Sequence, residues 1–307
     1  MPHSRAARCR GYNVRRFGAG AAALAWLAAA TAADPVASTE RVADFEAGIT
    51  YDNNLGNGHF RSDIRGDFFA TAATSQGLFF PLGDSDGVTL TGDLRAQAFD
   101  RFDGMNNLSL GPTLGYRRKF GLGSTAPWVA VSASAARLDF QNSIRNGWQY
   151  DAALRAGRRI DQQWDVSAEF RYERRTADHD APLVPGIPGD VFDIRGRSLA
   201  LNADYAWTEK TLFSLSYGYR NGDVVSTTRP NFSIFRSSAA IAADPVFGDD
   251  AFAYRLYAAT QLLALRASQA LGSNSSLNLG LQRQLSRGDG GNNYAKNLVE
   301  LTYLHSF

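Results

Sequence analysis

Apolar and polar residues alternate along several segments of the chain. In residues 164–173 every second residue is apolar, and the residues between them are polar or charged: Trp164, Val166, Ala168, Phe170 and Tyr172 alternate with Asp165, Ser167, Glu169, Arg171 and Glu173. A β-strand sends successive side chains to opposite faces, whereas a helix would mix the two sets. The pattern therefore predicts strands with one apolar face and one polar face.

The same alternation recurs along most of the chain, and Gly, Asn, Asp, Ser or Pro residues bound the segments. The clearest segments are 45–51, 88–98, 108–116, 148–155, 164–173, 199–207, 213–219, 277–281 and 299–307. Segments 66–82, 127–140 and 253–271 alternate less regularly. Together they predict about twelve strands, an even number that would place both ends of a barrel chain on the same side of the membrane.

Two all-β architectures fit such strands, a soluble antiparallel sandwich and a membrane-spanning barrel. Beyond residue 33 no apolar run approaches the roughly 20 residues that a membrane helix needs, so only a closed barrel could span a bilayer. Aromatic residues begin or end strands, as expected for rings at the two membrane interfaces. These residues are Trp128, Trp148, Trp164, Tyr51, Tyr172, Tyr205, Trp207 and Tyr219. This placement favours an all-β, transmembrane, antiparallel up-and-down β-barrel of about twelve strands, over residues 41–307.

The predicted connections support this choice, because short periplasmic turns and longer outer loops should alternate in such a barrel. Tight turns are predicted at 83–86, 121–125, 161–163, 208–210 and 272–275, whereas 176–194 and 222–251 are long, polar and contain proline. We assign the long pair to the outside. The second of these contains an apolar patch, Ala239-Ala240-Ile241-Ala242, followed by Asp244-Pro245-Val246-Phe247. The patch either folds into the mouth and narrows it or packs on the rim.

The amino-terminal segment has the features of an export signal. Five arginines precede an apolar run from Ala19 to Ala30, and Ala30-Thr31-Ala32 offers small residues for cleavage. We interpret residues 1–33 as a signal peptide and residues 34–40 as a short amino-terminal segment. Cleavage would remove Cys9, the single cysteine, and would change the formal charge from +2 to −3. Neither a redox role nor nucleic-acid binding is expected of the remaining chain.

The last segment alternates up to the final residue, with Val299, Leu301, Tyr303 and Phe307 on one face and His305 in the same series. This pattern resembles the terminal strand of Gram-negative outer-membrane β-barrel proteins. The resemblance covers about residues 41–307 and implies a location in the cell outer membrane, among outer-membrane lipid. It also implies that the five residues Val299, Leu301, Tyr303, His305 and Phe307 act as a signal for the barrel-insertion machinery.

A second resemblance concerns the end of the first strand. Tyr51-Asp52-Asn53-Asn54-Leu55 is similar to the Tyr-Asp-x-Asn opening of several outer-membrane barrels and of the barrel of surface lipoprotein assembly modifiers. Those modifiers carry helical repeats before the barrel, and residues 34–40 could not hold them. The motif implies an alternative function, in which the barrel assists the export or display of surface proteins.

Candidate catalytic groups are sparse. His59 is predicted in the first outer loop and His305 at the periplasmic end, so they would lie far apart. Asp178-His179-Asp180 occupies three adjacent positions of a loop, which cannot all point to one centre without a special turn. We therefore expect no catalytic set, no metal site and no cofactor, and the protein is not expected to be an enzyme.

The polar face of the strands carries nearly balanced charges. The residues expected at mid-barrel are Asp93, Arg95, Asp151, Arg155, Glu169, Arg171 and Asp204. Opposite charges that face a water-filled lumen would hold small polar solutes or ions, which predicts a passive, porin-like channel with a narrow or gated lumen. Alternatively, the same residues could pair across strands and fill the lumen, which would leave a structural barrel without transport.

Overall fold

The computed structural model describes residues 39–180 and 182–307. The predicted signal peptide, residues 1–33, lies outside the described residues, as does most of the segment 34–40. The described part contains thirteen strands. Their bounds are β1 Glu40–Asp52, β2 Asp67–Pro81, β3 Asp86–Phe99, β4 Asn107–Lys119, β5 Trp128–Phe140, β6 Gly147–Arg159, β7 Trp164–Ala177, β8 Ile194–Ala206, β9 Thr211–Thr228, β10 Ala240–Ala243, β11 Phe252–Ala270, β12 Ser275–Gly288 and β13 Asn293–Ser306.

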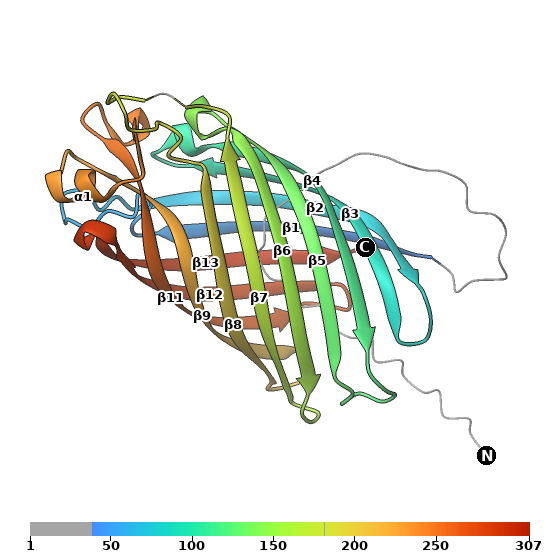
Figure 1. The fold of residues 1–307 in the computed structure, drawn as a ribbon. Coiled ribbons are helices and arrows are strands. Elements are labelled where there is room, and N and C mark those ends of the chain that lie inside the picture. Colours follow the sequence, from blue (N-terminus) through green and yellow to red (C-terminus); the bar gives the residue numbers. More distant parts are fainter. Residues whose placement is uncertain (1–38, 181) are drawn as a thin grey trace, which may run out of the picture.

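Twelve of these strands form a closed barrel (Figure 1). Each strand pairs antiparallel with the next one in the chain, β9 pairs with β11, and β13 returns to pair with β1. The last pairing runs from Asp44 opposite Ser306 to Asp52 opposite Leu298. The predicted fold class and strand number are therefore confirmed. The short strand β10 is additional and pairs only with the first residues of β11.

The barrel is apolar outside and polar inside. Leucines in the middle of the strands point outward and remain exposed, among them Leu110 (56%), Leu201 (58%) and Leu265 (51%). Their neighbours along each strand point inward and are polar, for example Ser109 and Asn202, which are buried. A soluble protein would bury the apolar set instead, so this arrangement suits a wall that faces lipid. Within the described residues, no helix is long and apolar enough to cross a membrane.

Aromatic side chains cluster near both ends of the wall. At one end Trp164, Tyr205, Trp207 and Phe213 form a row of ring contacts, with centroids 4.7–6.4 Å apart. At the other end Tyr51 packs on Phe68. Trp128 does not belong to the outer set that the sequence predicts, because it faces the lumen. There the Arg117 guanidinium lies 4.7 Å from its ring, and Gly157 on the neighbouring strand leaves it room.

The connections differ strongly between the two ends. The turn end has short links, at residues 82–85, 120–127, 160–163, 207–210 and 271–274. The loop end, at the left of Figure 1, has the links 53–66, 100–106, 141–146, 178–193, 229–251 and 289–292. Five helical segments occur in the described residues, all in these loops: Asp103–Met105, Ser143–Arg145, α1 Phe232–Ser237, Pro245–Phe247 and Asp289–Gly291. The alternation of short and long links follows the prediction.

Candidate pore and the cap over its mouth

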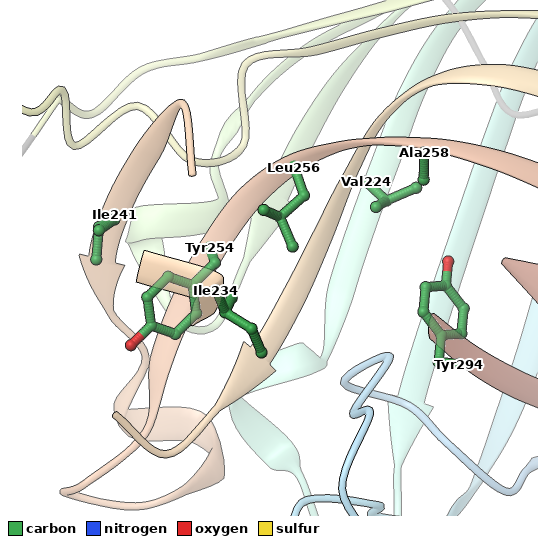
Figure 2. Close-up of a cluster of buried hydrophobic side chains, with 7 residues drawn as sticks. All are labelled: Val224, Ile234, Ile241, Tyr254, Leu256, Ala258 and Tyr294. Atoms are coloured by element: carbon green, nitrogen blue, oxygen red, sulfur yellow. The ribbon is translucent and has the colours of Figure 1, made fainter. Parts of the chain in front are cut away.

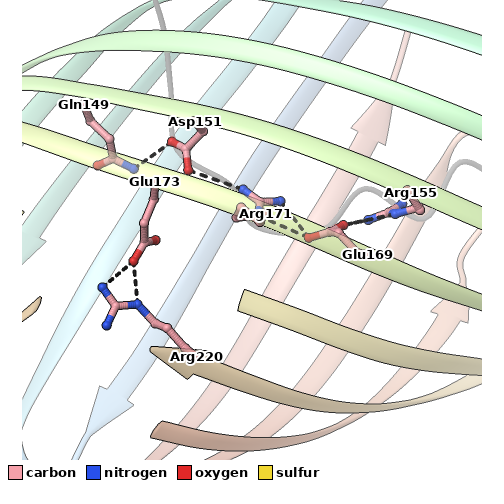
Figure 3. A network of polar contacts seen from close by, with 7 residues as sticks. All are labelled: Gln149, Asp151, Arg155, Glu169, Arg171, Glu173 and Arg220. Atoms are coloured by element: carbon pink, nitrogen blue, oxygen red, sulfur yellow. Dashed lines mark hydrogen bonds and ion pairs between the residues drawn. The ribbon is translucent and has the colours of Figure 1, made fainter. Parts of the chain in front are cut away.

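A chain of ion pairs crosses β6 and β7 on the inner face of the wall (Figure 3). Arg155 binds Glu169 directly across the two strands, with 2.6 Å between Nη2 and Oε2. Arg171 binds Glu169 at 3.1 Å and Asp151 at 3.6 Å. Four of the seven predicted lumen residues therefore lie in one network. In this network each carboxylate contacts at least one guanidinium, which lowers the cost of placing charge inside the barrel.

Two further contacts lie toward the loop end. Gln149 donates to Asp151, and Arg220 on β9 pairs with Glu173 on β7, although β8 lies between those strands (Figure 3). The intervening residue is Gly196, which lies opposite both Glu173 and Gly222. A Cβ atom there would lie 2.6 Å from Arg220 Nη2 and 2.8 Å from Glu173 Oε1. The absence of a side chain at position 196 thus allows the pair to form.

The three remaining predicted lumen residues lie elsewhere on the inner face. Arg95 on β3 forms an ion pair with Glu46 on β1, at 3.7 Å across the small side chain of Ala73. Asp93 accepts hydrogen bonds from Ser75 and from Thr113 on the two neighbouring strands. Asp204 is directly opposite Asp165, and its Oδ1 atom is buried without a hydrogen-bond partner. The seven residues are therefore all inward-facing, but they form four separate groups.

These charged groups are only partly buried. The exposed fractions of the side chains are 27% for Arg155, 21% for Arg171, 21% for Arg95 and 23% for Glu46. Since these side chains point inward, the exposed parts face the interior of the barrel. Water therefore reaches the guanidinium groups from the lumen.

One ribbon of the wall extends beyond its neighbours at the loop end. Pairing of β8 with β9 stops at Gly222, and pairing of β11 with β12 stops at Ala258, yet β9 and β11 continue as a two-stranded ribbon to Thr228 and Phe252. We call residues 223–257, the ribbon with its loop, the cap. Gly222 has φ +155°, and a Cβ atom on it would lie 2.4 Å from Gly196 Cα. The two glycines let β9 pass close to β8 where the cap begins.

The cap contacts the loops on every side of the mouth. Val225 and Thr227 are hydrogen-bonded to Asn57 and Gly56 of loop 53–66, at 2.8 and 2.7 Å. The Phe247 ring packs on Phe102 of loop 100–106. Two further contacts reach the neighbouring loops, Ile241 N to Pro188 O at 2.9 Å and Ser233 Oγ to Gly290 O at 2.8 Å. Because β1 is four strands away from β9 around the barrel, these bonds require the cap to cross the opening.

A buried ion pair joins the cap to the far wall. Arg145, in loop 141–146, donates from Nη2 to Asp244 Oδ2 at 2.6 Å, and Thr227 donates to the same oxygen at 2.7 Å. The Arg145 and Asp244 side chains are only 5% and 0% exposed. Burial lowers the pKa of Arg145, and the Asp244 carboxylate opposes that shift. Breaking such a pair leaves a buried charge without compensation, so the pair holds the cap in place.

Two apolar clusters fill the cap. In the first, Ile234 of α1 and Ile241 of β10 belong to one buried cluster with Tyr254, Leu256 and neighbouring side chains (Figure 2). In the second, Ala240, Ala242 and Ala253 pack against Val191 and Phe192 of loop 178–193. Both faces of the ribbon are therefore covered, unlike those of the barrel strands. Of the two positions left open for the apolar patch Ala239–Ala242, the structure shows the one in which the loop folds across the mouth.

Sequence reasoning missed the residues that fasten the cap. Arg145 and Asp244 are 99 positions apart, and neither lies in a pattern that marks a partner. The apolar run of loop 229–251 left two positions open, in the mouth or on the rim, and it did not indicate what the loop contacts.

The terminal residues and the first-strand motif have identifiable contacts. Val299 and Leu301 face outward, while Ser275 Oγ lies 2.8 Å from His305 Nδ1 and 3.1 Å from the Tyr303 hydroxyl. Phe307 N donates to Ala43 O at 2.9 Å. In the motif, Asn54 donates to Gly58 O and Ala295 O, and Asp52 pairs with Lys296. The motif therefore fastens loop 53–66 to β13.

The three histidines in the described residues do not come together. His59 lies in loop 53–66 against Asn293 O, and His305 lies at the turn end. His179 lies in loop 178–193, beside the pair that Asp178 forms with Arg137. In residues 39–180 and 182–307, no group of three or more His, Cys, Asp or Glu side chains has an arrangement that could hold a metal ion.

Comparisons with solved structures identify the type of fold. No protein-family model matches the chain, and no curated protein matches its sequence. Among solved structures, an outer membrane channel from Pseudomonas putida F1 is similar over 91% of this chain and 100% of that chain, with a TM-score of 0.54 and 13% identity. Two other structures are more distant. The outer membrane channel DcaP of Acinetobacter baumannii has a TM-score of 0.43 and 8% identity, over 91% of this chain and 100% of that chain. The NanC porin has a TM-score of 0.44 and 8% identity, over 86% of this chain and 100% of that chain. The chain therefore has the barrel fold of an outer-membrane channel.

Proposed function

We propose that this protein is a passive channel of the outer membrane for small polar solutes or ions, held shut at its outer mouth by the cap. The apolar outer wall supports a place in outer-membrane lipid, and the water-accessible charges of the inner wall support a polar path. The terminal residues Val299 to Phe307 would serve the barrel-insertion machinery. On this proposal the protein acts without a catalytic set or a cofactor.

The main observation in support of this proposal is the cap. A barrel with a purely structural role needs no ordered segment across its mouth, whereas a channel that must stay closed does. The cap crosses the opening and is fastened by one fully buried ion pair, Arg145–Asp244, and by a more exposed pair, Arg255–Asp190, while its other contacts are hydrogen bonds and apolar packing. Such contacts can be broken without unfolding the barrel, because the barrel strands are paired independently of them.

Single-channel conductance in planar bilayers tests the proposal. We expect refolded wild-type protein to stay mostly closed with brief openings. Asp244→Ala should raise the open fraction at least tenfold, because it leaves Arg145 buried and unpaired on the closed side. Replacing residues 230–250 by a short Gly-Ser linker should give steady conductance.

A matched control lies in the same loop. Asp250 pairs with Arg229, and both side chains are more than half exposed. Asp250→Ala should therefore leave the open fraction unchanged. Absence of conductance in the linker variant, with the barrel folded, would exclude the channel and favour the barrel with a charge-filled lumen. Recovery of one stoichiometric surface protein with that silent barrel would instead support the export alternative suggested by the Tyr51–Leu55 motif.

A further inference from the structure

Two arginines lie close together where the cap meets the wall. Arg145 belongs to loop 141–146, and Arg175 lies on β7 near the loop end. Both guanidinium groups lie against the ring of Phe192, with 4.5 and 5.4 Å from Cζ to the ring centroid. Arg175 also donates from Nη2 to the carbonyl oxygen of Arg145. The two positive charges therefore share one small, largely enclosed space.

The charges in this space do not balance. Asp244 compensates Arg145, but no carboxylate among the described residues forms an ion pair with Arg175. The Nε atoms of Arg145 and Arg175 are both buried without a hydrogen-bond partner. The site thus has a surplus positive charge and two unused N–H donors, whereas buried charges and donors in proteins are normally paired.

Aromatic rings compensate only part of this imbalance. Arg175 lies between Phe140 and Phe192, with Cζ 5.1 and 5.4 Å from the centroids, so the rings stabilise its charge. A ring stacked on the face of a guanidinium does not accept the N–H bonds that point outward in its plane. The rings therefore leave both Nε–H groups, which are buried, without an acceptor.

We propose that Arg145 and Arg175 bind a small organic monocarboxylate. The planar guanidinium fork matches a carboxylate, and one negative charge suits a site whose surplus is one positive charge. Phe140 and Phe192 stack on the guanidinium group of Arg175, and Ile144 packs against the cluster that contains Phe192, so the body of the ligand would lie among apolar side chains. A carboxylate bound there competes with Asp244 for Arg145 and loosens the cap. The binding site stands on its own, while this link to opening rests on the proposed channel function.

Calorimetric titration of benzoate into the refolded full chain in nonionic detergent, at fixed ionic strength, tests the site. We expect saturable binding at one site. Arg175→Gln should weaken it at least tenfold, because it removes one guanidinium and leaves the Arg145–Asp244 pair in place. Arg137→Gln is the matched control, since Arg137 lies near the same end but already pairs with Asp139 and Asp178. It should bind benzoate like the wild type.

Three results would overturn the proposal: no saturable heat with the wild type, equal affinity in Arg175→Gln, or equal competition by chloride. Circular dichroism of Arg175→Gln checks that the barrel is formed, and Arg175→Lys provides a second variant that keeps the charge and loses the fork. Lys at this position should also weaken binding. Conductance measured on the same samples separates the two ideas, because binding without conductance would retain the site and remove the channel, and conductance without binding would do the reverse.

Discussion

Gly196 shows how a single residue shapes the lumen. It carries no side chain where the Arg220–Glu173 pair crosses β8, and a Cβ atom would displace the ends of both side chains. Those ends are flexible, so the backbone should remain in place while the pair separates. Because the pair is 16% and 32% exposed, it contributes far less than a fully buried pair would.

We predict that Gly196→Ala is less stable than a matched glycine variant by about 1 kcal/mol, the upper end for partly exposed ion pairs. The matched variant is Gly280→Ala, also inward-facing on a strand, where the nearest atom to an added Cβ is 3.6 Å away. Both variants gain the same backbone rigidity, so their difference isolates the ion pair. Urea unfolding in phospholipid vesicles, followed by tryptophan fluorescence, measures it. Equal midpoints and slopes would show that the pair contributes nothing.

At the scale of an element, the cap is a separate unit of the wall. Its ribbon, residues 223–228 and 252–257, is paired only within itself, with β10 and with loops, whereas every barrel strand has two long ladders. Segments with fewer such supports open locally before the whole protein unfolds. The buried Arg145–Asp244 pair opposes this opening, together with the more exposed Arg255–Asp190 pair.

Hydrogen exchange should report this opening. In Asp244→Ala, amides of 223–228 should exchange at least tenfold faster, because a lost hydrogen bond between charged groups is worth about 1.5–3 kcal/mol and every 1.4 kcal/mol is a factor of ten. Amides of 213–219, on the same strand inside the barrel, serve as the internal control and should be unchanged. Faster exchange in both segments would mean that the substitution loosens the barrel and that the cap is not an independent unit.

Local pattern explains which elements could be predicted from the sequence. The alternation in β7 and β12 fixes which residues face outward, and turn residues mark their ends. Beyond Gly222, by contrast, both faces of the β9–β11 ribbon are buried, so alternation no longer distinguishes them. Trp128 was misplaced for a related reason, since an aromatic residue at a strand end suits an interface as well as a lumen. The contact of Arg145 with Asp244 has no local signal at all.

At the scale of the whole molecule, the distribution of polar and apolar side chains is the reverse of that in a soluble protein. The polar network of Asp151, Glu169 and Arg171 occupies the interior, and leucines occupy the surface. The inward direction of these side chains could be predicted because polarity alternates with position, whereas their grouping into separate pairs depends on strand register. Register, such as Arg155 opposite Glu169, follows from turn lengths and barrel closure together.

The last prediction concerns how deep the outward-facing residues of the barrel wall lie in the membrane. Leu281 and Leu277 point outward from β12, and the first lies mid-strand while the second lies near the turn end. Arginine at the bilayer midplane of a barrel costs about 2–4 kcal/mol, falling to about 0–1 kcal/mol near the interfaces. Leu281→Arg should therefore be destabilised by about 2–4 kcal/mol and Leu277→Arg by about 1 kcal/mol or less.

Urea unfolding in phospholipid vesicles measures both variants against the wild type, with the same strand, face and substitution in each. The contrast between the two positions matters more than either value, because only a lipid slab makes the cost of a charge depend on depth. Equal costs at both positions would mean that β12 does not cross a bilayer in the orientation that its exposed leucines require. A larger cost at Leu277 than at Leu281 would place the hydrocarbon layer at the turn end and would contradict the assignment of the aromatic rows to the two interfaces.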